Sequence, residues 1–164
     1  MKKISKRILV GAALLLLALG AMTERSDAAP HGVAWKPSLQ VALQEAKRTK
    51  KPVMVELGAK WCAPCRAMEK NTYTHLSVVR ESRKWVPVKI DIEAHPEIAA
   101  RYGLQTPPLV VFLKSDGTVV SKFTGYADAA GMVKQMQAAY AKTHAKASKA
   151  NRGASKKLAK EVSK

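Results

Sequence analysis

Two cysteines carry the clearest chemistry in this sequence of 164 residues. Cys62 and Cys65 are its only cysteines, separated by Ala63 and Pro64, and good helix formers follow them in residues 66–70. The pair therefore predicts a helix that opens at Cys62, where free backbone amides and the helix field stabilise a thiolate. In this interpretation Cys62 is the exposed nucleophile that attacks a disulfide. Cys65, one helical turn further on, resolves the mixed disulfide.

Two other interpretations of the pair remain open. A structural zinc site needs four ligands, and the histidines show no ligand spacing with the pair; they are His31, His75, His95 and His144. A purely structural disulfide would close a four-residue loop, which removes little chain entropy compared with a long loop. The redox interpretation is favoured, and it requires neither a metal nor another cofactor.

The dipeptide between the cysteines influences the redox potential. It is Ala63-Pro64, so a proline restrains the turn and no histidine stabilises the thiolate further. This favours a comparatively stable disulfide and a dithiol that gives up electrons readily. Surrounding residues also contribute, because about 30 mV changes the equilibrium constant tenfold. We therefore predict that the dithiol donates electrons to substrate disulfides. Residues elsewhere in the site can override the influence of the dipeptide.

The residues before the pair predict the elements that position it. Ser38 is a good N-cap for a helix that runs to about Lys50, and Lys51-Pro52 ends that helix. Residues 53–57 are apolar except for Glu56, as is typical of a strand buried on both faces of a sheet. This strand would deliver Cys62 to the start of the next helix.

The remaining chain alternates between helical and strand patterns. We expect helices over 76–84, 96–102 and 128–142, strands over 85–92, 109–113 and 119–123, and a hairpin turn at 115–118. Pro96 suits a first helical turn and Gly103 a helix end. These elements predict an α/β fold around one mixed sheet, in a single domain over residues 29–142.

The first 28 residues have the pattern of a secretory signal. A basic start is followed by an apolar stretch from Ile8 to Met22 and a small-residue cleavage site ending at Ala28. We expect cleavage after Ala28 and a periplasmic or otherwise secreted protein. An uncleaved membrane anchor is the less favoured alternative, because these 15 residues fall short of the about 20 that span a bilayer.

The charge balance is strongly basic, with 29 lysines and arginines against 12 acidic residues. Eight of the basic residues lie in 141–164, against Glu161 alone. Residues 143–164 have too few apolar side chains to fold by themselves and are predicted to be a disordered tail. The tail is either merely solvated or adheres to an anionic envelope surface or an acidic partner. Nucleic-acid binding is not expected, because the signal exports the protein and no nucleic-acid motif is present.

The stretch Lys51-Pro52-Val53-Met54-Val55-Glu56, followed by Trp61-Cys62-Ala63-Pro64-Cys65, resembles the thioredoxin superfamily. The likeness covers nearly all of residues 36–142. It is greatest to the C-terminal thioredoxin-like domain of the membrane thiol:disulfide interchange reductase and to small secreted thioredoxins. The resemblance implies a thioredoxin fold, a central mixed sheet flanked by helices, and thiol:disulfide oxidoreductase activity on disulfide-containing proteins. A separate electron-donor protein, such as a membrane thiol reductase, would be needed.

The resemblance also implies roles for residues around the pair. Glu56 matches a buried acid that takes the proton from Cys65, and Lys89 matches a lysine that pairs with this acid. The alternative is that Glu56 points to an edge and Lys89 to water.

The substrate groove of the family is formed partly by prolines and an aromatic residue. Pro108 matches the cis-proline of the family, with Pro107 as a rival for that position. Trp61 would pack beside the sulfurs, and Pro64 lies between them. Thr106 and Leu109 depart from the residues that the family often has around its cis-proline, and both departures fall on the groove.

Three functions remain open at this point. The favoured one is a secreted disulfide reductase. The others are a redox-silent binding module with the same fold and a disulfide oxidase or isomerase. Cytochrome c biogenesis is a possible role, because apocytochrome haem sites also carry paired cysteines, yet nothing in the sequence recognises them.

Overall fold

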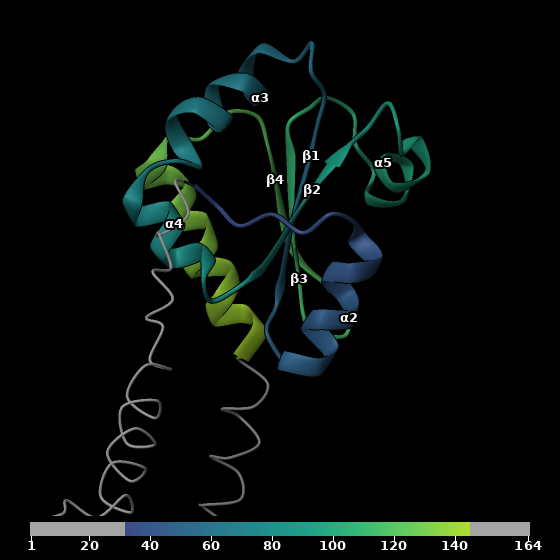
Figure 1. Ribbon diagram of the computed structural model, residues 1–164, viewed down its shortest axis with the longest axis vertical. Coiled ribbons are helices and arrows are strands. Elements are labelled where there is room, and N and C mark those ends of the chain that lie inside the picture. The colour runs from purple at the N-terminus through teal and green to yellow at the C-terminus, as the bar shows by residue number, and fades with distance from the viewer. Residues whose placement is uncertain (1–31, 145–164) are drawn as a thin grey trace, which may run out of the picture.

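The computed structural model describes residues 32–144, and Figure 1 labels its helices and strands. In chain order the elements are α2 (Leu39–Thr49), β1 (Val53–Gly58), α3 (Ala63–Ala67), η1 (Met68–Thr72), α4 (Leu76–Ser82), β2 (Val86–Asp91), α5 (Pro96–Tyr102), β3 (Leu109–Leu113) and β4 (Val119–Thr124). Residues 129–144 form a further helix. The predicted signal segment, 1–28, and all but the first two residues of the predicted tail lie outside the described residues. Within the described range no helix is long and apolar enough to cross a membrane.

Four strands form one mixed sheet in the order β2-β1-β3-β4. β1 is parallel to β2 and antiparallel to β3, and β3 is antiparallel to β4. The predicted α/β fold with a mixed sheet is therefore confirmed. β1 lies inside the sheet with all its residues buried, which explains why its sequence is an almost unbroken apolar run.

Helices cover both faces of this sheet (Figure 1). α2 and α5 pack on the face formed by Val53, Val55 and Leu57. The opposite face carries Met54 and is covered by η1, α4 and the helix of residues 129–144. Because side chains alternate along a strand, Glu56 points to this second face, under the helices that follow the cysteines.

Helix ends follow the local chemistry of the chain. Ser38 caps α2 as predicted, since its Oγ accepts a hydrogen bond from the Val41 N–H at 3.2 Å. Gly103 ends α5 with φ 70°, in the left-handed region that favours glycine. The last helix is capped by Asp128, whose Oδ1 accepts from the Gly131 N–H at 2.7 Å. That helix extends through residue 144, two residues beyond its predicted end.

The helix after the cysteines differs from a simple α-helix. α3 passes into the π-helix η1, where the Tyr73 N–H donates to the Met68 carbonyl at 2.9 Å. The Thr72 hydroxyl donates to the Ala127 carbonyl at 2.7 Å, which ties η1 to the start of the last helix. A widened turn of this kind depends on such tertiary contacts, and the residue preferences of the segment do not signal it.

Candidate active site

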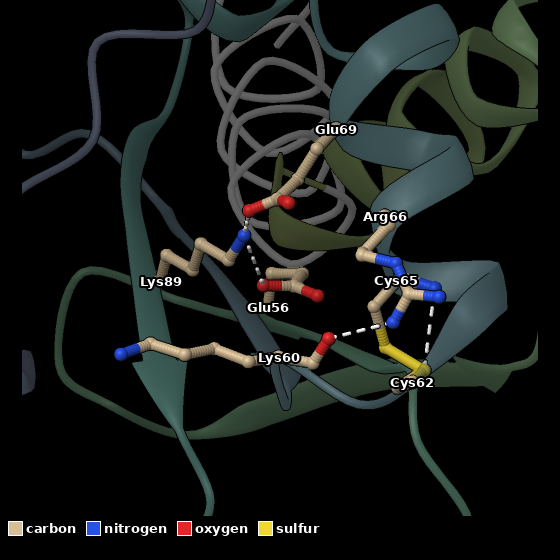
Figure 2. Close-up of polar contacts among 7 residues, drawn as sticks. All are labelled: Glu56, Lys60, Cys62, Cys65, Arg66, Glu69 and Lys89. Carbon is tan, nitrogen blue, oxygen red and sulfur yellow. Dashed lines mark hydrogen bonds and ion pairs between the residues drawn. A yellow bond between two sulfur atoms is a disulfide. The ribbon is translucent and has the colours of Figure 1, made fainter.

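The cysteine pair lies at the start of α3, just after the loop that follows β1. Cys62 is the N-cap residue of α3, and it forms a disulfide with Cys65. The Cys65 N–H donates to the Cys62 Sγ at 3.2 Å, as Figure 2 shows. A thiolate at Cys62 would therefore receive a backbone hydrogen bond as well as the field of the helix start.

Both cysteines are buried in the disulfide form. Cys62 is 4% exposed and Cys65 2%, and Ala59 and Ile92 pack against them. The expectation that Cys62 is the exposed sulfur is therefore wrong for this form, because residues just after β1 and just after β2 pack against the pair. Trp61 is 61% exposed. Its ring is largely open to solvent instead of packed beneath the protein surface, so it can meet a partner that approaches the pair.

Glu56 lies directly behind the sulfurs. Its side chain is 1% exposed, so the alternative in which it points to an edge is wrong. A Cβ placed on Gly58 would lie 2.6 Å from Glu56 Oε1 and 3.3 Å from Cys65 Sγ. The carboxyl and the resolving sulfur thus share the small space above Gly58, and any side chain at residue 58 would intrude between them.

Lys89 is the cation nearest to this acid. It is the register partner of Glu56 across β1 and β2, and its Nζ lies 4.0 Å from Glu56 Oε2. The same ammonium forms a closer ion pair with Glu69 of η1, and Figure 2 shows it between the two carboxylates. Lys89 is therefore shared, and Glu56 Oε2 has no hydrogen-bond partner among the described residues.

This incomplete compensation determines how Glu56 titrates. Burial raises the pKa of the Glu56 carboxyl to about 7, and the positive charge of Lys89 lowers it only in part. A carboxyl with a pKa near neutrality is protonated and deprotonated with equal ease at working pH. Glu56 can therefore both accept and release a proton beside Cys65.

A cavity of about 300 Å³ opens beside these groups. It is lined by Gly58, Ala59, Lys60, Glu69, Lys89 and Asp91. Water fits in a polar space of this size, and both Gly58 and Lys89 border Glu56. The cavity therefore lies next to the buried carboxyl, although Glu56 itself is not among the residues that line it.

The predicted proline loop lies at the same end of the sheet as the cysteines. Leu109 pairs with Leu57 in the antiparallel register, so Pro108 reaches the level of Gly58. The Pro107-Pro108 peptide bond is cis, which assigns the family's cis-proline to Pro108 over Pro107. Pro108 is buried and Pro107 is partly exposed, so Pro107 is the one that can face a bound chain.

Two residues of this site were not predicted. Gly58 could have been noticed, because a glycine that ends a buried strand just before reactive residues often marks a close approach of other atoms. Glu69 stands one helical turn after Cys65 and looks like an ordinary surface residue in the sequence. Its ion pair with Lys89 arises only when η1 packs over β2.

The other polar groups bear on the zinc interpretation. Within residues 32–144, no group of three or more histidine, cysteine or acidic side chains is placed to hold a metal ion.

The Arg66 guanidinium donates to the Lys60 carbonyl at 2.7 Å, which braces the loop that carries Trp61. The arrangement is a disulfide at a helix start with a buried carboxyl behind it.

Comparisons with known proteins agree with this chemistry. Thiol:disulfide interchange protein DsbD of Yersinia enterocolitica is 31% identical over 147 residues, which is 80% of this chain and 25% of that protein. The chain thus spans about a quarter of the length of this relative. The C-terminal domain of Neisseria meningitidis DsbD in its oxidised form is 27% identical with a TM-score of 0.55, covering 60% of this chain and 90% of that domain.

A disulphide isomerase from Xylella fastidiosa is 26% identical with a TM-score of 0.54, covering 64% of this chain and 95% of that protein. A protein-family model described as thioredoxin-like matches residues 34–115. The chain therefore belongs to the thioredoxin-like family and carries the Cys-X-X-Cys pair of its thiol:disulfide oxidoreductases.

Proposed function

We propose that this protein is an exported disulfide reductase that works through the Cys62 and Cys65 dithiol. The observation that carries the proposal is the placement of the Glu56 carboxyl and the Cys65 sulfur around the same point above Gly58. A purely structural disulfide has no need of a buried, proton-exchanging acid at its inner sulfur. A redox pair does, because its inner thiol must lose a proton in each turnover.

The first step is attack on a substrate disulfide. The Cys62 thiolate, held by the Cys65 N–H, displaces one sulfur of the substrate and forms a mixed disulfide. The displaced substrate sulfur leaves as a thiolate and takes a proton from water. The exposed ring of Trp61 and the edge at Pro107 would contact the substrate chain during this step.

The second step resolves the mixed disulfide. Glu56 takes the proton of Cys65, and the resulting thiolate attacks the Cys62 sulfur. The intramolecular disulfide forms, and the second substrate sulfur leaves and is protonated through Glu56 and the adjoining cavity. The substrate has gained two electrons and two protons, and the protein pair is oxidised.

The direction of electron flow follows from the Ala63-Pro64 dipeptide. It supports a stable disulfide and hence a reducing dithiol. A separate dithiol protein must then reduce the Cys62–Cys65 disulfide after each turnover. A membrane thiol reductase of the DsbD type is the natural candidate. Isomerase activity is the second candidate, supported by the name of the Xylella fastidiosa neighbour.

The compartment is part of the same proposal. The signal pattern of residues 1–28 supports export to the periplasm, where disulfides form and persist. Proteins with wrongly formed disulfides and apocytochromes with paired cysteines are the substrates proposed in that compartment.

Equilibration of the purified protein with glutathione buffers tests the direction. We expect a potential between about −200 and −270 mV, the range from glutaredoxins to thioredoxin. A value near about −120 mV, as for a strong oxidant, would contradict the reductase proposal. Insulin reduction, with C62S as the control, distinguishes a redox enzyme from a redox-silent binding module.

A further inference from the structure

A group of cations lies at the end of the sheet opposite to the active site. We call it the basic pole; it consists of Lys47, Arg48, Lys50, Lys51, Arg83 and Lys114. All are exposed except Lys114, which is half-buried. In Figure 1 this end is at the bottom, where α2 finishes, and the segment that leads into α3 is at the top.

The topology of the sheet brings these residues together. Val53 at the start of β1 pairs with Val86 at the start of β2 and with Leu113 at the end of β3. Lysines and arginines that flank these three strand ends therefore meet at one edge. The end of α2 adds the basic residues of its last turn.

Contacts and shared hollows connect five of the six cations, and Arg48 lies on the last turn of α2 next to Lys47. Lys51 Nζ donates to the Arg83 carbonyl at 3.0 Å. Lys47 and Lys50 line one surface hollow, and Lys50 and Lys114 line the next, together with His144 of the last helix. The chain after the described residues therefore begins at the pole. It adds seven lysines and arginines against one glutamate in residues 145–164.

The charge of the pole is largely uncompensated. Among residues 32–144, none of the six cations forms an ion pair; Glu45 pairs with Lys36, and Glu81 with Lys84. Two acids of the described range border the pole. Asp116 lines the hollows of Lys50 and Lys114, and its Oδ1 accepts from the Thr118 N–H within its own turn. Glu45 lines a hollow with Lys51 and Arg83 but pairs with Lys36. The active-site end is mixed by contrast, because Glu69, Asp91, Glu93 and Glu97 accompany the cations there.

We propose that the basic pole, together with the basic sequence that follows it, binds the anionic headgroups of a phospholipid bilayer. The cations come from several elements and form a broad surface instead of converging in one pocket, which suits a sheet of charges better than a single phosphate group. Most are lysines, whose flexible stems adapt to laterally mobile headgroups. Binding at this end would hold the cysteine pair away from the bilayer and open to protein substrates.

Vesicle binding of the full mature chain tests the proposal. The protein should sediment with vesicles of equal parts phosphatidylglycerol and phosphatidylcholine at about 0.1 M salt, where the Debye length is about 10 Å, and not with phosphatidylcholine alone. The triple variant K47Q/R48Q/K114Q should bind about a hundredfold more weakly, from about a fivefold loss per cation. The matched variant K60Q/K70Q/R101Q, with the same change in net charge, should lose less than tenfold.

The outcomes separate a built surface from bulk charge. Equal losses in the two triple variants would overturn the pole as the binding surface. Failure of the unaltered chain to sediment with the anionic vesicles would overturn membrane binding and leave an acidic protein as the partner to seek.

Orientation has its own readout in Trp61. The chain has three tryptophans; Trp85 is buried, Trp35 is partly buried and Trp61 is exposed at the active-site end. Acrylamide quenching of the tryptophan fluorescence should therefore change by less than a factor of two when the protein binds vesicles. A severalfold loss of quenching would show that the active-site end faces the bilayer and would overturn the proposed orientation.

Discussion

The two ends of β1 use charge in opposite ways. At its C-terminal end the buried Glu56 has one incomplete partner, Lys89, which it shares with Glu69. At its N-terminal end Lys50 and Lys51 are exposed and lie among other exposed cations. At the active-site end a few charges lie in the protein interior, which screens them poorly. At the basic pole many charges lie in water, which screens them well.

This difference decides how much each charge contributes. Two charges 4 Å apart interact by about 1 kcal/mol in water and by about 4 kcal/mol at the effective dielectric constant of about 20 that describes charge pairs within proteins, buried ones included. A single change at the buried end should therefore alter chemistry measurably, whereas at the exposed end only several changes together should matter. The predictions below test this contrast from the largest expected effect to the smallest.

Loss of the attacking sulfur should have the largest effect. We expect C62S to reduce insulin no faster than the buffer with dithiothreitol alone, because serine cannot form the mixed disulfide. In the reduced unaltered protein, iodoacetamide near neutral pH should label Cys62 before Cys65, since only the Cys62 Sγ receives the helix-start hydrogen bond. Peptide mapping that finds Cys65 labelled first would reverse the two roles.

Replacement of the buried acid should come next. E56Q keeps the shape of the side chain and removes the proton acceptor, so turnover should fall by about a hundredfold, at the lower end of general-base effects. In the unaltered protein the rate should rise with pH through about 7, the pKa of Glu56. E56Q should lose that rise. If the rate of E56Q still rises with pH through 7, another titrating group is responsible for the rise.

The same substitution should stabilise the fold at neutral pH. The carboxyl has a pKa of about 7 when folded, against the ordinary 4.5, so the folded state keeps a proton that the unfolded chain releases between these values. Its stability therefore falls as pH rises from 4.5 to 7, by about 3 kcal/mol. Urea denaturation should show that loss in the unaltered protein and not in E56Q.

Lys89 offers a direct test of the contrast between the ends. K89M removes the charge that lowers the pKa of Glu56, so the rising limb of the pH profile should shift above 7 and the rate at pH 7 should fall a few-fold. K47M removes an exposed lysine from the last turn of α2 and should leave the profile unchanged. Equal shifts in the two variants would mean that net charge, and not the buried pair, sets the limb.

Much of this arrangement could be predicted because local signals and tertiary packing agree. The apolar run of β1, the Ser38 cap and the Gly103 helix end each specify a structure that the fold then uses. The position of Cys62 at a helix start follows from the residues after it. These features need only neighbours in the sequence.

Other features depend on packing between distant segments. The burial of Cys62 comes from Ala59 and Ile92, and Ile92 lies just beyond the end of β2. The division of Lys89 between two carboxylates requires η1 to cover β2, and η1 is itself a π-helix held in part by Ala127. No local pattern carries this information. The sequence therefore predicted an exposed Cys62 and gave no sign that Glu69 belongs to the site.

The smallest effect is expected at Pro107, on the substrate side of the active-site end. A chain bound in extended form pairs its backbone with the edge it meets, and a proline there has no N–H to donate. Pro107 is partly exposed while Pro108 is buried, so the missing donor lies on the side open to a substrate. P107T should restore it and tighten peptide binding by about 0.5 to 1.5 kcal/mol, the net contribution of a typical hydrogen bond.

The measurement is the affinity of a substrate peptide in a C65S background, which prevents resolution of the mixed disulfide. The redox potential, measured with both cysteines present, should stay the same, because the sulfurs and α3 are untouched. Unchanged affinity in P107T would show that bound chains do not pair with this edge, and the exposed ring of Trp61 would then be the main substrate contact.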